Sequence, residues 1–330
     1  MDKVRVGVIG TGYLGKFHAE KYANMADAVL VGVVDVDRAA AAAVADRWGG
    51  PAYTDYREIL DRVDAVSIVV PTPAHFSIAM ECLENDLDIL VEKPMTSTLA
   101  EADRLIETAA ARKKILQVGH LERFNPAVHP LKDIVNQPLF IESHRLALYN
   151  ERGTDVSVVL DLMIHDIDII LNFARSGIRM IRAAGLSVIS EHVDIANARL
   201  EFDSGCVANV TASRISNRNE RKLRMFQKDA YISVDFGNSA ITVVDKSGEG
   251  NGSGPIPGLN TRSLSFTRWD ALEQELTAFV HCVRNRLTPE VSGQEGRKAL
   301  RTALEVMEQI HQTEKMFEQS TAATTDRAGE

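Results

Sequence analysis

Cysteine is scarce in this 330-residue chain, and its three cysteines are widely separated. Cys82, Cys206 and Cys282 form no C-x-x-C pair, so the sequence predicts free buried thiols and neither a disulfide framework nor a thiolate metal site. We therefore expect no bound metal. An excess of positive charge is also lacking: the formal net charge of −9 argues against a nucleic-acid partner.

Long apolar runs are missing as well. No stretch approaches the ~20 apolar residues that a membrane-spanning helix needs, and no charged-then-apolar leader precedes the first predicted strand. We therefore expect a cytoplasmic protein with no membrane partner. The length leaves room for two domains, and the composition, 45% hydrophobic and 25% charged, is ordinary for a globular protein.

A glycine-rich turn near the start of the chain is the most informative motif. It follows the apolar run 4–9, precedes a predicted helix over 16–26, and consists of Gly10, Thr11, Gly12, Tyr13, Leu14 and Gly15. In a strand–G-x-G-x-x-G–helix unit, the first glycine permits a tight turn and the second lets the backbone approach a pyrophosphate. The third lets helix and strand pack closely. The helix N-terminus then attracts the phosphates.

An acidic residue in the right place supports this interpretation. Asp35 ends the second apolar run, 29–34, where a carboxylate can accept the ribose hydroxyls of adenosine and favour NAD over NADP. Arg38 follows closely and can tolerate a 2′-phosphate, so the preference for NAD is an expectation. The alternative is a chance cluster of glycines with a strand-end aspartate.

Short apolar runs alternate with helical segments up to about residue 120. Further strands are predicted over 65–70, 88–91 and 115–119, and helices over 38–48, 56–61, 75–85 and 97–112. This pattern predicts an α/β fold with a doubly wound parallel sheet of the Rossmann type. Ligands bind beyond the carboxyl ends of such strands. The cofactor cleft should therefore include Pro71, Thr72, His75, Glu92 and Lys93.

The pattern changes after residue 125. A long helix is predicted over 156–173, and strands over 139–149, 178–189, 196–202, 206–213, 222–226, 231–236 and 240–244. Because most of these strands have no helical crossovers between them, we expect an α+β domain with an open, mainly antiparallel sheet. A mobile loop over 248–258 and helices over 270–286 and 294–317 follow. The expected domains are 1–122 for the cofactor and 123–319 for substrate, with a disordered tail over 320–330.

Two groups of polar residues can carry chemistry. Asp161, His165 and Asp168 share one face of the predicted helix 156–173, and an imidazole oriented by a carboxylate is a candidate general base. The alternatives are a structural histidine or a two-residue metal site from His165 and Asp168. Lys93 lies where the nicotinamide must sit, and its ammonium can stabilise an alkoxide; the alternative is a solvated lysine. Pro94 fixes the next turn and can adopt a cis bond.

Taken together, these motifs resemble those of the Gfo/Idh/MocA family (glucose–fructose oxidoreductase, inositol 2-dehydrogenase, rhizopine catabolism) over nearly the whole chain. The resemblance implies an NAD-dependent dehydrogenase of a sugar hydroxyl, with Lys93, Asp161 and His165 as the catalytic group. It also implies a homodimer or homotetramer formed through the C-terminal sheet. Met163 departs from the pattern, because the family often has glycine between the aspartate and the histidine.

Within the family, segments 120–126 and 159–168 are most similar to bacterial nucleotide-sugar 3-dehydrogenases. This implies oxidation of the 3-hydroxyl of UDP-N-acetylglucosamine or its uronic acid, for the amino sugars of lipopolysaccharide. The arginines near the helix can bind a diphosphate or form ion pairs: Arg123, Arg145 and Arg152. We expect His120, Asn125 and Asp168 to contact the sugar. The alternatives are an inositol or free-aldose dehydrogenase, an NAD-dependent glycosidase and an NAD sensor.

Overall fold

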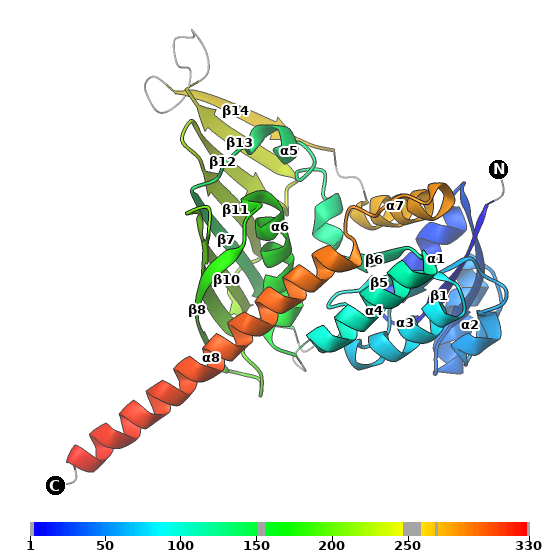
Figure 1. Ribbon diagram of the computed structural model, residues 1–330, viewed down its shortest axis with the longest axis horizontal. Coiled ribbons are helices and arrows are strands. Elements are labelled where there is room, and N and C mark those ends of the chain that lie inside the picture. The colour runs from blue at the N-terminus through cyan, green and yellow to red at the C-terminus, as the bar shows by residue number, and fades with distance from the viewer. Residues whose placement is uncertain (1–2, 151–152, 154–155, 247–258, 268–269, 329–330) are drawn as a thin grey trace. The chain divides into compact units, whose positions relative to one another are not determined.

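The computed structural model describes residues 3–150, 153, 156–246, 259–267 and 270–328, with backbone alone for 318 and 320–328. The chain forms two compact units (Figure 1). The first contains Met1–Phe124 and Trp269–Leu300, and the second Asn125–Arg268 and Arg301–Glu330. The expected boundary at 122/123 lies close to the first division. Residues 269–300, expected in the second domain, belong to the first unit.

The first unit is built on a six-stranded parallel sheet. Its strands are β1 (Val4–Ile9), β2 (Ala28–Val34), β3 (Ala52–Tyr53), β4 (Ala65–Ile68), β5 (Asp88–Glu92) and β6 (Leu116–Gly119). The spatial order is β3-β2-β1-β4-β5-β6, and every neighbouring pair is parallel. The order reverses between β1 and β4, so the predicted doubly wound sheet is confirmed.

Helices cover both faces of this sheet. The helices are α1 (Gly15–Asn24), α2 (Arg38–Trp48), α3 (His75–Glu84), α4 (Leu99–Arg112) and α7 (Ala271–Asn285), and the single 3₁₀ turns are η1 (Tyr56–Ile59), η2 (Thr72–Ala74) and η3 (Leu121–Phe124). α1 packs against α2 and α7, whereas α3 packs against α4. Side chains fix several helix starts: Asp37 caps α2, and Thr98 forms a capping box with Glu101 at α4.

α7 completes the first unit although it comes from the far end of the chain. Its Leu276 and Phe279 are fully buried in one apolar cluster with Val6 and Val8 of β1 and with Tyr22 of α1. Such burial contributes roughly 1.5–3 kcal/mol per large apolar side chain. α7 therefore belongs to the core of this unit.

The second unit holds an eight-stranded sheet. Its strands are β7 (Phe140–Leu148), β8 (Ile178–Leu186), β9 (Ile195–Phe202), β10 (Val207–Ser216), β11 (Glu220–Phe226), β12 (Ala230–Asp235), β13 (Ala240–Asp245) and β14 (Asn260–Ser265), in the order β14-β13-β12-β11-β7-β10-β9-β8. All neighbours are antiparallel except β7 and β10, which confirms the mainly antiparallel sheet. Strand β14 was not predicted.

The helices of the second unit differ from expectation in two places. The predicted helix over 156–173 is a π-helical turn, η4 (Val159–Met163), followed by α6 (Ile164–Ala174); a short α5 (Leu131–Ile134) precedes β7. α8 (Gly293–Ala328) continues through most of the segment predicted as a disordered tail. The reason is that no glycine or proline interrupts 297–328. The predicted mobile loop 248–258 lies outside the described residues.

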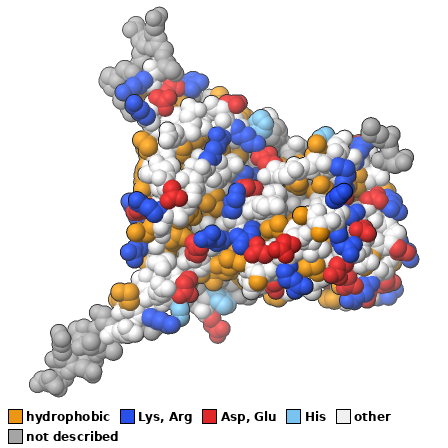
Figure 2. All heavy atoms as spheres, in the orientation of Figure 1, with side chains coloured by type: hydrophobic (Ala, Val, Ile, Leu, Met, Phe, Trp, Pro, Cys, Tyr) orange, Lys and Arg blue, Asp and Glu red, His pale blue; other side chains and the backbone are white. Residues whose placement is uncertain are grey.

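The surface is of mixed polarity on the face shown in Figure 2, where acidic and basic side chains alternate over both units. Within the described part of the chain, no helix has the length and apolar character needed to cross a membrane.

Candidate active site

The glycine-rich turn has the geometry that a pyrophosphate requires. Gly10 has φ +94°, and a Cβ on it would lie 2.5 Å from the Val69 carbonyl oxygen. A Cβ on Gly15 would lie 1.8 Å from the oxygen of Gly10, so the helix packs tightly on the turn. A Cβ on Gly12, by contrast, would meet no atom within 4 Å. The open side of the turn is thus at Gly12, where backbone must approach the phosphates of a dinucleotide.

Asp35 is fixed against this turn. Its Oδ2 accepts hydrogen bonds from the Thr11 backbone N–H at 2.7 Å and the Thr11 hydroxyl at 2.9 Å, and its Oδ1 accepts one from the Asp37 N–H at 3.0 Å. Burial raises the pKa of Asp35, but these hydrogen bonds outweigh it and leave the pKa below its ordinary value. A fixed carboxylate at the end of β2 suits the ribose hydroxyls of NAD and repels a 2′-phosphate.

His75 joins two of the predicted turns. Its Nδ1 lies 2.9 Å from the Pro94 carbonyl oxygen and its Nε2 lies 2.8 Å from that of Val70. Burial lowers the pKa of His75, although both carbonyls and Glu92 oppose the shift. The ring therefore ties the backbone after β4 to the backbone after β5, while Pro71 is exposed and Thr72 is half-buried on η2.

The Glu92-Lys93-Pro94 turn follows β5. The Lys93–Pro94 bond is cis, as the sequence allowed, and Lys93 is half-buried. The Glu92 carboxylate lies 3.2 Å from Nε2 of His18, and it fills the space where a Cβ on Gly119 would stand. Glu92, predicted to bind the cofactor, is buried and contacts His18 and the Lys93 backbone N–H.

In the second unit, the candidate base lies where η4 becomes α6. Asp161 belongs to the π-helical turn and His165 to the first turn of α6, and both are half-buried. Asp168, expected on the same face, is only 2% exposed, and Met163 is fully buried. Isolated π-helical turns often occur at functional sites. Because the Met163 side chain enters the core, it does not reach the open side of the helix.

Buried arginines hold this helix in place. Arg145 of β7 forms a two-pronged ion pair with Asp166 of α6, with Nε–Oδ2 at 2.7 Å and Nη2–Oδ1 at 3.1 Å. Arg214 of β10 donates to the carbonyl oxygens of Gly153 and Val156. A Cβ on Gly153 would lie 3.0 Å from Oδ2 of Asp161, so Arg214 supports the backbone beside that carboxylate. No motif in the sequence pointed to Arg214.

Several residues predicted to contact the sugar are engaged within their own units. Arg123 is buried, with Nη2 3.7 Å from Oε2 of Glu295, and His120 is buried as well. Asn125 donates to the Phe236 carbonyl at 3.3 Å and accepts from the Ala127 N–H at 3.0 Å. Together with the Arg145–Asp166 pair, these contacts favour the ion-pair alternative over a diphosphate site. Arg152 lies outside the described residues.

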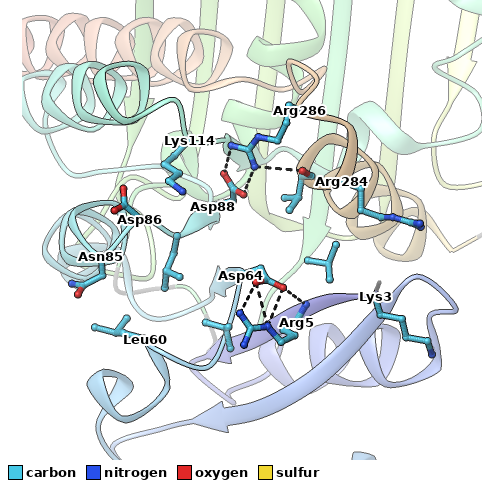
Figure 3. A pocket seen from close by; sticks show the side chains of 14 residues that line it. Lys3, Arg5, Leu60, Asp64, Asn85, Asp86, Asp88, Lys114, Arg284 and Arg286 are labelled. Atoms are coloured by element: carbon cyan, nitrogen blue, oxygen red, sulfur yellow. Dashed lines mark hydrogen bonds and ion pairs between the residues drawn. The ribbon is translucent and has the colours of Figure 1, made fainter. Parts of the chain in front are cut away.

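The first unit also has a cavity of about 770 Å³ at the amino-terminal ends of β1, β4 and β5 (Figure 3). Its lining contains two ion pairs: Arg5 with Asp64 at 2.7 Å, and Arg286 with Asp88 at 2.6 Å. Cofactors bind at the opposite, carboxyl ends of parallel strands. This cavity is therefore separate from the cofactor turn.

Two further findings concern metals and thiols. All three cysteines are free and buried. In the described ranges, no group of three or more His, Cys, Asp or Glu residues is placed to hold a metal ion.

The parallel sheet, its glycine turn and the acidic end of β2 define an NAD-binding oxidoreductase. Two family profiles agree: "Oxidoreductase family, NAD-binding Rossmann fold" matches residues 4–120, and "GFO/IDH/MocA C-terminal domain" matches residues 142–233. The chain belongs to the Gfo/Idh/MocA family of NAD-dependent dehydrogenases, as its motifs implied.

Individual relatives narrow the comparison. The chain is 37% identical over 308 residues to UDP-N-acetylglucosamine 3-dehydrogenase of Acidithiobacillus ferrooxidans, covering 93% of this chain and 97% of the relative. The solved structure of that enzyme superposes with a TM-score of 0.89 over 94% of this chain and 98% of that one. Myo-inositol 2-dehydrogenase of Thermotoga maritima is 27% identical, over 90% of this chain and 93% of the relative.

Proposed function

We propose that the protein oxidises a hydroxyl of a UDP-linked sugar, with the 3-hydroxyl of UDP-N-acetylglucosamine or its uronic acid as first candidate. The observation that carries the proposal is the similarity to a UDP-N-acetylglucosamine 3-dehydrogenase along 93% of this chain. Its product would be a 3-keto sugar, a substrate for installing a 3-amino group in lipopolysaccharide.

In the proposed reaction, three residues act on the sugar. His165 takes the proton of the hydroxyl as general base, and Asp161 orients the imidazole and stabilises the positive charge that forms on it. Lys93 stabilises the developing alkoxide with its ammonium group. Asp168 is buried one turn beyond His165.

The first unit holds the cofactor. Gly12 would admit the pyrophosphate, Thr11 and Asp35 would border the adenosine ribose, and Thr72 would line the cleft. NAD supplies the hydride acceptor when it is bound. The chain's own contribution is to orient the sugar and to manage the proton.

The test is NADH formation, followed by its near-ultraviolet absorbance, with a panel of UDP-sugars, inositols and free aldoses. 2-Oxoglutarate is added in parallel reactions as an acceptor for NADH that stays bound. We expect turnover with UDP-N-acetylglucosamine or its uronic acid, and a drop of about 10²–10⁴-fold in kcat for His165→Ala with NAD binding retained.

Each other outcome points elsewhere. Turnover restricted to inositols would overturn the nucleotide-sugar assignment and favour the activity of the inositol dehydrogenases to which the chain is also similar. Product formation without net NADH would favour the glycosidase alternative. Bound NAD without any turnover would favour the sensor.

We also propose that the outer face of the second unit's sheet joins copies of this chain. Phe140, Phe226 and Tyr231 form an aromatic row on β7, β11 and β12, with ring centroids 5.6 and 5.0 Å apart. Phe226 remains 36% exposed, although its neighbour Met225 is buried. Light scattering should show a dimer or tetramer for the wild type and a smaller species for Phe226→Glu; a monomeric wild type would contradict the proposal.

A further inference from the structure

A buried group of ionisable residues lies in the first unit, behind the Glu92-Lys93-Pro94 turn. Glu92 ends β5, His18 lies on α1, and Glu275 lies on α7. His18 and Glu275 are completely buried, and neither carboxylate oxygen of Glu275 has a hydrogen-bond partner. Buried carboxyl groups are costly unless they are paired, neutral or used. None of the proposed catalytic steps accounts for these residues.

The two carboxyl groups are in opposite charge states. Burial raises the pKa of Glu275 well above its ordinary value, and the negative charge of Glu92 raises it further. Burial also raises the pKa of Glu92, but the contact and attraction of His18, with the charges of Lys93 and His75, outweigh burial and hold it low. Burial therefore favours the neutral acid at Glu275, whereas the contacts of Glu92 favour its anion.

Glu92 is the link between this group and the lysine. Its Oε2 accepts the Lys93 backbone N–H at 3.3 Å, while its Oε1 lies 3.2 Å from His18. An ionised carboxylate beside an amine stabilises the ammonium form, and a protonated carboxyl does not. Whatever keeps Glu92 ionised therefore keeps Lys93 ready to stabilise an alkoxide.

We propose that His18 is a positioning residue for Lys93: from α1 it holds the Glu92 carboxylate in its ionised form beside the lysine. The inference rests on the proposed role of Lys93 in the reaction. Four groups face or adjoin Glu92 and enter its titration: His18 from α1, His75 from α3, Glu275 from α7 and Lys93 at its own strand end. Of these, only His18 contacts the carboxylate oxygens from another element at a distance typical of an ion pair.

The first test needs no turnover. Loss of the His18 contact should raise the pKa of Glu92, because that contact favours the ionised carboxylate. Infrared difference spectra against pH should then show an additional protonated carboxyl band in His18→Gln that is absent in the double variant His18→Gln/Glu92→Gln. Trace acylation of Lys93, read by mass spectrometry against the other lysines, should rise about three- to tenfold in His18→Gln and in Glu92→Gln.

Glu275→Gln is the matched control. It replaces a buried neutral acid with a neutral amide of similar shape in the same group, so Lys93 acylation and the kcat–pH profile should stay as in the wild type. In His18→Gln, the acid limb of kcat should move to higher pH and become steeper, because Glu92 protonation joins that of the base. NAD affinity at neutral pH should change less than about twofold.

Two results would overturn the inference. One is a His18→Gln protein that loses stability but keeps the wild-type kcat–pH profile and Lys93 acylation, which would leave His18 with a structural role alone. The other is equal change in Glu275→Gln, which would make the effect one of packing. If the wild type oxidises no sugar in the panel, the proposed function fails, and the infrared and acylation measurements still decide what His18 does.

Discussion

Removing the Arg145 side chain while leaving Asp166 should destabilise the second unit by about 3–5 kcal/mol. The two side chains are 4% and 1% exposed, and two short contacts join the guanidinium to the carboxylate. Arg145→Met would leave a carboxylate buried with its main partner gone, and that uncompensated charge sets the cost. The loss is a large fraction of the 5–15 kcal/mol that stabilises a typical domain.

A double-mutant cycle measures the effect. We expect Arg145→Met and Asp166→Leu each to be strongly destabilising, and the double variant to cost less than about 1 kcal/mol, because well-packed apolar residues replace buried ion pairs at little cost. Urea unfolding should be followed by hydrogen exchange of peptides from β7 and α6. Local exchange is needed because the two units can unfold separately.

The same cycle separates a structural arginine from one that binds a diphosphate. If the pair is structural, the double variant should keep the wild-type KM for a UDP-sugar. The proposed cost of an unpaired buried charge would be refuted if either single variant lost less than about 1 kcal/mol of unfolding free energy. It would also be refuted if the double variant lost as much as the two single variants together. A selective rise in KM of the double variant would instead return Arg145 to the substrate site.

Three further predictions follow from the first unit. Asp35→Asn should weaken NAD binding and reduce the preference for NAD over NADP, measured as the ratio of the two Kd values. An unchanged ratio would contradict the contact between Asp35 and the ribose. Gly15→Ala should lower Tm markedly, because its Cβ would collide with the Gly10 oxygen. Gly12→Ala should keep the wild-type Tm and bind NAD more weakly. Equal losses of Tm in the two variants would contradict this prediction. Glu275 keeps its proton in the folded chain at pH values where the unfolded chain has lost it. The free energy of unfolding therefore falls as pH rises from the ordinary pKa of 4.5 toward the raised pKa of the folded state. The fall is at most about 1.4 kcal/mol per pH unit. Glu275→Gln removes that loss, so its advantage in urea unfolding should grow with pH across this window; a constant difference would count against a protonated Glu275.

The regular part of the fold was predictable because it depends on local patterns. Near-continuous apolar strands separated by helices indicated the parallel sheet, and uninterrupted strands indicated the antiparallel one. The features that were not predicted depend on contacts between distant segments or on fine backbone geometry. The sequence of α7 shows an amphipathic helix, but its packing on β1 joins segments more than 260 residues apart. The π-helical turn at Val159–Met163 has the same apolar spacing as an ordinary helix at this length.

The candidate site shows a similar division. Glycines reveal their roles because few other residues fit such turns, so the cofactor turn was recognisable. The partners of the arginines could not be predicted, because a cation in the sequence does not show which carboxylate it meets: Arg123 meets Glu295, and Arg145 meets Asp166. Glu275 did leave a signal. It lies three residues after Leu272 and four before Phe279, on the apolar face of α7, where a charge is unexpected.

The place of α7 in the first unit has a consequence for synthesis on the ribosome. Val6 and Val8 emerge first, but Leu276 and Phe279, which share their core, emerge about 270 residues later. At roughly 5–20 residues per second, the nascent first unit waits on the order of 13–50 s for its last helix. During that time residues 125–268 of the second unit are made, and the apolar surface that α7 will cover stays uncovered. Early folding of the first unit is therefore tied to the completion of the chain.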